Sequence, residues 1–209
     1  MIFNGEFVPL SVIFIEFMSI NLFKRVWDVL VSPSKTWDKI ILESEGDKKY
    51  LTNYFYPLIG LAAFTAFLSP FIKGYEELEL KATMLVGIQA FVVTLLSAFL
   101  GFFITVRTLN YSFVRWFGMK SDLRKSEMLT AYASTPVLVV SILTRLLSDF
   151  FFMKVLFVYV IVLTWEASTH FYSVEESKQG RFTAICSISI LVIPFVVEKI
   201  FLILLPGLK

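Results

Sequence analysis

Long apolar runs separated by short polar segments dominate the sequence from residue 50 onward. No charged residue lies between Lys49 and Lys73, or between Lys81 and Arg107. A helix needs about 20 mostly apolar residues to cross the roughly 30 Å hydrocarbon core of a bilayer. Each run is long enough, so the pattern predicts a membrane-spanning helix in both.

Three more apolar runs follow in the second half of the chain. Residues 128–145 and 155–172 are mostly apolar, and we expect a tight helical hairpin that turns near residues 148–149 between them. The last run covers residues 182–205. The pattern therefore predicts an all-α integral membrane bundle of five transmembrane helices over residues 50–209.

Lysine and arginine are distributed unevenly among the polar segments. Six of them lie between Met18 and the first span and five lie between the second and third spans, whereas the intervening loop carries two lysines beside three glutamates. Basic loops are retained on the cytoplasmic side of a membrane. We therefore expect a cytoplasmic N-terminus and, with five spans, an external C-terminus.

Residues 1–17 differ from a secretory signal, because they contain two glutamates and neither lysine nor arginine. A segment of a different pattern begins at Met18. We expect that the natural protein starts at Met18 and that residues 1–17 are an extended reading frame or a disordered segment. The alternative is a helix that lies at the membrane interface.

Residues 18–49 are predicted to form a cytoplasmic amphipathic segment. A helix in its first half would have one apolar stripe and one charged face, the pattern of helices that lie on a membrane surface. Ser32 and Pro33 are suited to begin a second short helix that carries Trp37. Because tryptophan concentrates at membrane interfaces, Trp27 and Trp37 are the expected interfacial anchors. Two roles stay open: seating the first span, or binding a partner. The apolar stripe comprises Leu22, Phe23, Val26, Trp27 and Leu30.

The composition is that of a membrane protein and excludes several soluble classes. Charged residues make up 17% of the chain and hydrophobic residues 57%, against about 25% charged in an average soluble domain. One cysteine and one histidine cannot form a disulfide framework or a zinc site. A net charge of +2 gives no reason to expect nucleic acid, and no cofactor is indicated. The expected partner is the lipid bilayer, with a membrane protein partner or a homo-oligomer left open.

Three short segments identify a family resemblance. They are SPSKTWDKI before the first span, YFYPLIG at its start and YASTPVLVV in the third span, and they include Pro33, Trp37, Pro57 and Pro136. With these segments and five spans, the chain resembles the short bacterial members of the Yip family, the Ypt-interacting-protein-type membrane proteins. The eukaryotic signature Asp-Leu-Tyr-Gly-Pro is absent, so Rab binding is not implied. The resemblance implies a five-span protein of the bacterial cytoplasmic (inner) membrane, in a superfamily whose eukaryotic members organise vesicle traffic and membrane shape.

Small residues form one continuous face of the predicted second span, because they recur every three or four residues. Helices in lipid associate by close backbone approach and van der Waals contact. This face therefore predicts a helix-packing interface, within the bundle or between subunits. It comprises Gly87, Ala90, Thr94, Ser97 and Gly101.

Two charges inside the predicted spans stand out, since a charge in a membrane is costly unless it is paired or hydrated. Arg145 in the third span and Glu198 in the fifth should reach a similar depth near the outer boundary. We expect them to form a buried ion pair with Asp149 and Lys154 at its rim. The neighbouring Lys199 can extend toward the interface. The pair is either a structural clamp between helices or part of a binding site or ion path.

Glu166 and His170 lie one helical turn apart at the cytoplasmic end of the fourth span. Such a pair can transfer protons, but the pattern favours a plain interfacial hydrogen bond, because no nucleophile or metal partner stands at a recognisable spacing. The intramembrane protease pattern Glu-Glu-x-x-x-Arg fails at Glu175 and Glu176, since Gly180 occupies the arginine position. No other catalytic motif was found, so we do not expect an enzyme.

Two functions from different classes stay open. The first is a non-catalytic scaffold, adaptor or bilayer-organising protein of the Yip type. The second is a small transporter or channel that uses Arg145, Asp149 and Glu198. A transporter needs a polar route across the membrane, whereas the apolar residues 156–163 separate these charges from Glu166. An odd number of spans also does not divide into two inverted repeats.

Overall fold

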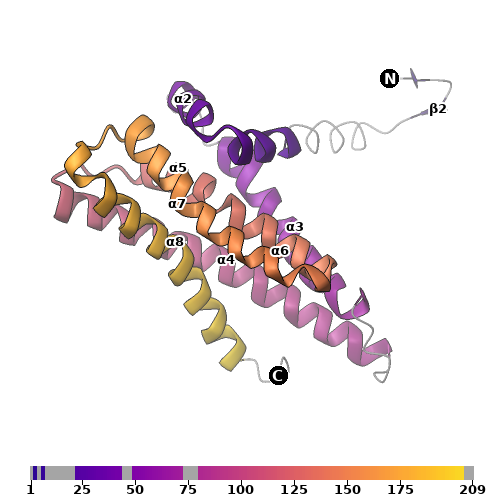
Figure 1. Ribbon diagram of the computed structural model, residues 1–209. Coiled ribbons are helices and arrows are strands. Elements are labelled where there is room, and N and C mark those ends of the chain that lie inside the picture. The colour runs from indigo at the N-terminus through magenta and orange to yellow at the C-terminus, as the bar shows by residue number, and fades with distance from the viewer. Residues whose placement is uncertain (1, 4–5, 8–21, 44–48, 73–79, 205–209) are drawn as a thin grey trace.

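The computed structural model describes residues 2–3, 6–7, 22–43, 49–72 and 80–204, of which residues 2–3, 6–7, 43 and 148–151 are described by their backbone alone. The fold is an all-α bundle (Figure 1) with five helices long and apolar enough to cross a membrane, which confirms the predicted number of spans. Two short strands, β1 (Ile2–Phe3) and β2 (Glu6–Phe7), pair near the N-terminus. The expected start at Met18 lies outside the described residues.

The N-terminal strap, residues 22–43, precedes the spans and consists of helical residues 22–31 and α2 (Pro33–Glu43). The five spans follow in chain order, some of them built from more than one helical element. They are the π-helix η1 (Leu51–Phe55) with α3 (Tyr56–Ile72); α4 (Leu80–Phe117); α5 (Leu123–Ala133) with α6 (Thr135–Leu146); the 3-10 helix η2 (Ser148–Val158) with α7 (Tyr159–Glu166) and the π-helix η3 (Ala167–Phe171); and α8 (Glu176–Leu204).

The third span is divided into two helices at Ser134. Pro136 has no backbone N–H, so it cannot continue the hydrogen-bond ladder of α5, but it is favoured in the first turn of a new helix, where it stands in α6. At the other end, the side chain of Asp122 caps α5 by accepting a hydrogen bond from the backbone N–H of Lys125 at 2.9 Å. The charged first turn of this span therefore forms a regular helix.

The helix α4 extends well beyond the apolar run that predicted the second span. Its 38 residues rise about 57 Å, more than the roughly 30 Å of a bilayer core. It ends before Gly118, whose φ of +64° is a left-handed conformation that glycine adopts easily. In its last turns Phe113 stacks on Phe182 of α8, with ring centroids 4.8 Å apart. The bundle thus continues past the apolar part of the spans.

The largest buried cluster lies where the strap meets the bundle. It includes Trp37 of the strap, Tyr54, Tyr132, Phe171 and Phe182. Figure 1 shows the indigo strap lying across one end of the bundle, with the last turns of α8 at the other end. The N-terminal segment therefore completes the core at this end.

Candidate functional site

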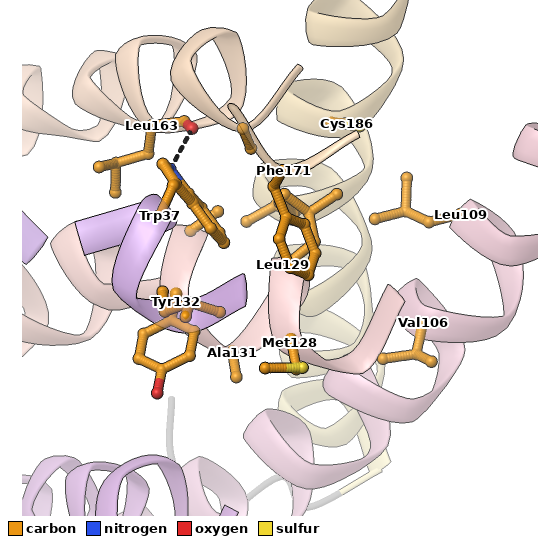
Figure 2. Close-up of a cluster of buried hydrophobic side chains, with 14 of the residues drawn as sticks. Trp37, Val106, Leu109, Met128, Leu129, Ala131, Tyr132, Leu163, Phe171 and Cys186 are labelled. Atoms are coloured by element: carbon orange, nitrogen blue, oxygen red, sulfur yellow. Dashed lines mark hydrogen bonds between the residues drawn. The ribbon is translucent and has the colours of Figure 1, made fainter. Parts of the chain in front are cut away.

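The strap is docked onto the bundle through Trp37. Its indole is 2% exposed, and Nε1 donates a hydrogen bond to the backbone oxygen of Leu163 in α7 at 3.1 Å (Figure 2). The ring packs beside Tyr132 of α5 and Phe171 of η3, with ring centroids 6.1 and 5.3 Å away. The prediction that Trp37 is an interfacial lipid anchor is therefore wrong.

The physical reason is that an amphipathic stripe can be covered by protein as well as by lipid. In α2 the apolar side chains of Trp37 and Ile40 are fully covered by the bundle. A buried indole N–H needs an acceptor, and the carbonyl of Leu163 supplies one. Periodicity identifies the apolar stripe but does not determine what covers it.

Further contacts hold the first half of the strap beside the spans. Nη2 of Arg25 donates to the hydroxyl of Tyr132 at 3.0 Å, and the hydroxyl of Tyr159 donates to the backbone oxygen of Leu30 at 2.6 Å. Val26 packs against a small apolar cluster formed by α3 and α6. This cluster comprises Leu58, Ala62 and Ile142. These contacts hold the first half of the strap on the bundle, in addition to the contacts of α2.

The opposite face of the same helix is exposed. Phe23, Trp27 and Val31 are 75, 61 and 57% exposed and follow one another at intervals of four residues. Residues four apart lie on the same side of a helix, so these three form one apolar stripe, here called the outer stripe. That Trp27 is an interfacial anchor stays a prediction, and its exposure is compatible with it.

Tyr50 connects the start of the first span to α5. Its hydroxyl donates a hydrogen bond to Oε2 of Glu127 at 2.9 Å. Burial raises the pKa of Tyr50, and the hydrogen bond to the Glu127 carboxylate raises it further. The phenol therefore stays protonated and available as a donor.

Glu166 and His170 lie close together, and Asp38 of the strap joins them. Nε2 of His170 is 3.5 Å from Oε2 of Glu166, and Nδ1 is 2.9 Å from Oδ1 of Asp38. The group links α2 to η3 at a partly exposed position. Asp38 was not predicted as a partner, because it lies 132 residues from His170 and no local pattern marks it.

The structure brings Arg145 and Glu198 together. Nη2 of Arg145 lies 3.9 Å from Oε1 of Glu198, with side chains 23 and 39% exposed, so the two residues pair and the pair is only partly buried. Nη1 of Arg145 also donates to the backbone oxygen of Ala62 at 2.8 Å, which was not predicted. The side chain of Asp149 lies outside the described part of the chain, and Lys154 is exposed.

Removing Arg145 or Glu198 alone should destabilise the protein, and removing both should cost less than the sum of the two single losses. Breaking a fully buried pair costs about 3–5 kcal/mol, and the partial exposure of both groups lowers our expectation to roughly 1–3 kcal/mol. We would measure thermal unfolding in detergent for Arg145→Met, Glu198→Gln and the double variant. The double variant should recover part of the loss; strictly additive effects would show that the two side chains do not interact.

The small-residue face of α4 packs within the chain. A Cβ atom on Gly87 would lie 2.8 Å from the backbone oxygen of Phe67 in α3, and one on Gly101 would lie 2.8 Å from Cα of Pro194 in α8. The same face therefore contacts α3 near one end and α8 farther along. Its other members are Thr94 and Ser97, which are buried, and Ala90, which is half-buried.

The polar groups of the described residues do not converge on a metal site. No group of three or more His, Cys, Asp and Glu side chains in this part of the chain is placed to hold an ion. The thiol of Cys186 is buried in the apolar core. The arrangement that the structure does present is a docked strap with one covered face and one exposed face.

Comparison with known proteins adds one finding. The family model of the Yip1 domain matches residues 27–197, which is most of the chain and includes four of the spans and most of the fifth. No curated protein and no solved structure matches the sequence.

Proposed function

Because the chain belongs to the Yip1 domain family and is a multi-pass membrane protein, we propose that it is a non-catalytic scaffold or adaptor that organises the bilayer through its strap. The observation that carries the proposal is the division of the strap into two faces. One face, centred on Trp37, holds the strap on the bundle, while the outer stripe is exposed beside the spans.

The outer stripe has the chemistry of a surface that enters one leaflet. Its phenylalanine, tryptophan and valine can bury apolar area among acyl chains, while the exposed Lys24 and Lys35 extend toward lipid phosphates. A helix inserted in one leaflet occupies area there and none in the opposite leaflet. The strap therefore expands the cytoplasmic leaflet and favours curved membrane.

Fluorescence quenching tests where the outer stripe lies. In a background with Trp116→Phe and Trp165→Phe, only Trp27 and Trp37 emit. We expect lipids brominated near the headgroup to quench Trp27 strongly, because it is exposed on the strap, and to leave Trp37 unquenched, because it is enclosed by protein. Adding Trp27→Phe isolates Trp37 as the internal control. Quenching of Trp27 by aqueous iodide and not by brominated lipid would place the stripe in water and contradict the proposal.

The consequence for membrane shape can be measured on tubules pulled from giant vesicles. Wild-type protein should enrich on narrow tubules, and a variant with Phe23→Ser, Trp27→Ser and Val31→Ser should lose most of that enrichment. Ile203→Ser, an equally exposed apolar position at the far end of α8, is the matched control and should behave as wild type. Equal enrichment of all three proteins would reject the bilayer-organising role.

The non-catalytic part of the proposal rests on the lack of a recognisable catalytic motif in the sequence. The adaptor part requires a protein partner. Crosslinking in cells followed by affinity purification tests whether such a partner exists. A recurrent partner that is lost from variants of the strap surface supports the adaptor role. Recovery of the chain with no recurrent partner argues against it.

We also propose that the protein lies in a bacterial inner membrane with its N-terminus in the cytoplasm. The excess of lysine and arginine before the first span and between α4 and α5 supports this orientation. A reporter active only in the periplasm should be active when fused after Lys209, and one active only in the cytoplasm should be active between Met119 and Ser121. The opposite result from either reporter would contradict the proposed orientation.

A further inference from the structure

The Arg145 and Glu198 pair joins the end of α6 to α8 beside α3. Arg145 stands in the last turn of α6, which ends at Leu146, and its partner Ala62 belongs to α3. Glu198 is about 9 Å along α8 from Leu204. Figure 1 shows this last part of α8 running away from α4.

The hydrogen-bonding capacity of these two groups is not filled by the protein groups that the structure describes. A guanidinium has five N–H donors, of which the contact with the Ala62 oxygen uses one. The 3.9 Å separation from the Glu198 oxygen exceeds the length of a hydrogen bond. Within the described ranges Glu198 accepts no hydrogen bond, and its neighbour Lys199 lies over the ring of Phe195, 5.3 Å from the ring centroid.

Exposed apolar side chains of α8 flank these two groups. Both side chains are partly exposed, and the neighbouring Phe195 and Ile200 of α8 are large, apolar and at least half exposed. Polar groups that face a bilayer need a partner, because hydrocarbon offers none. The missing partners must therefore come from water or from a lipid headgroup.

We propose that Arg145 and Glu198 bind the headgroup of a phospholipid that carries a primary amine, such as phosphatidylethanolamine. The phosphate accepts hydrogen bonds from the guanidinium, and the ammonium donates to the carboxylate, so each charge of the zwitterion meets its opposite. The acyl chains lie along the exposed apolar residues of α8. A choline headgroup has no N–H to donate, and a purely anionic headgroup meets repulsion from Glu198.

This site shares no charged residue with the strap, and it does not rest on the proposed function. The helix α6 is short, and its end brings Arg145 to the boundary where the chain turns into η2. The geometry therefore predicts a lipid-selective site at one defined position.

Native mass spectrometry of the delipidated full-length protein tests the proposal with an equimolar mixture of phosphatidylethanolamine, phosphatidylcholine and phosphatidylglycerol. One additional charge-assisted hydrogen bond corresponds to roughly tenfold preference, so wild type should bind ethanolamine lipid about ten times more than choline lipid. Glu198→Gln should remove most of this preference, and Arg145→Gln should weaken binding of all three lipids.

Lys199→Gln is the matched control, because it changes a neighbouring charge on the same helix that faces Phe195 instead of Arg145. It should keep the preference of wild type. Equal binding of the ethanolamine and choline lipids to wild type would overturn the proposal. So would preferential binding of phosphatidylglycerol, or an undiminished preference in Glu198→Gln. Since Glu198→Gln keeps the size of the side chain, the test does not depend on whether the Arg145 variant folds.

Discussion

Replacing Trp37 by alanine should destabilise the protein by about 3–5 kcal/mol, the cost typical of truncating a buried tryptophan. The substitution removes the aromatic contacts with Tyr132 and Phe171 and the hydrogen bond to Leu163. It also loosens the strap, because Trp37 is the largest fully buried side chain that the strap contributes. We expect a lower midpoint of thermal unfolding in detergent and faster proteolytic cleavage within residues 22–43.

Trp27→Ala is the matched control for this experiment, since it removes the same side chain from the same strap at an exposed position. It should leave the unfolding midpoint in detergent nearly unchanged while reducing contact with lipid. Trp37→Phe should lie between the two, because it keeps one aromatic ring but removes the N–H donor and part of the buried ring volume. If Trp27→Ala and Trp37→Ala lower the midpoint equally, the docking of the strap through Trp37 is wrong.

The second large effect is expected for Gly101→Leu, which should separate α4 from α8 and cost about 3 kcal/mol, at the upper end of the usual range for overpacking. Even a single Cβ atom at this position would lie 2.8 Å from Cα of Pro194. Backbone atoms cannot rotate away as a flexible side chain can. The two helices must therefore move apart along their contact, and the side chains of both helices lose packing there.

Gly60→Ala provides the comparison, because a Cβ atom at Gly60 meets no other atom within 4 Å. It should keep or slightly raise the unfolding midpoint, since alanine favours helix over glycine. Gly101→Ala should fall between Gly60→Ala and Gly101→Leu. The measurement is the unfolding midpoint of each variant in one detergent. An unchanged midpoint for Gly101→Leu would show that α4 and α8 do not pack closely at Gly101.

The spans could be predicted from the sequence because a bilayer imposes a length. A charge-free run such as that between Lys81 and Arg107 has few alternatives to a transmembrane helix. The position of the small-residue face on α4 followed in the same way, from helical periodicity alone. Neither argument could show that α4 continues to Phe117, because its last turns are held by aromatic packing with α8 rather than by lipid.

The partners at the candidate sites could not be predicted, because they join segments far apart in the chain. Asp38 and His170 are separated by 132 residues, and Ala62 and Arg145 by 83. The second contact uses a backbone carbonyl, which every residue has, so no residue type marks it. Trp37 was placed wrongly for a related reason: an apolar stripe has the same sequence whether lipid or protein covers it.

The docked strap also imposes an order on biosynthesis. Leu163, which accepts the hydrogen bond of Trp37, is translated 126 residues after it. At roughly 5–20 residues per second, Trp37 waits about 6–25 seconds before its acceptor exists. During that interval the indole of Trp37 lacks the α7 partner that later encloses it. The nearest apolar environment for a ribosome-bound chain is the membrane into which its spans are being inserted. The strap would therefore first bind this membrane, and Trp37 would exchange lipid for protein only after α7 has been synthesised.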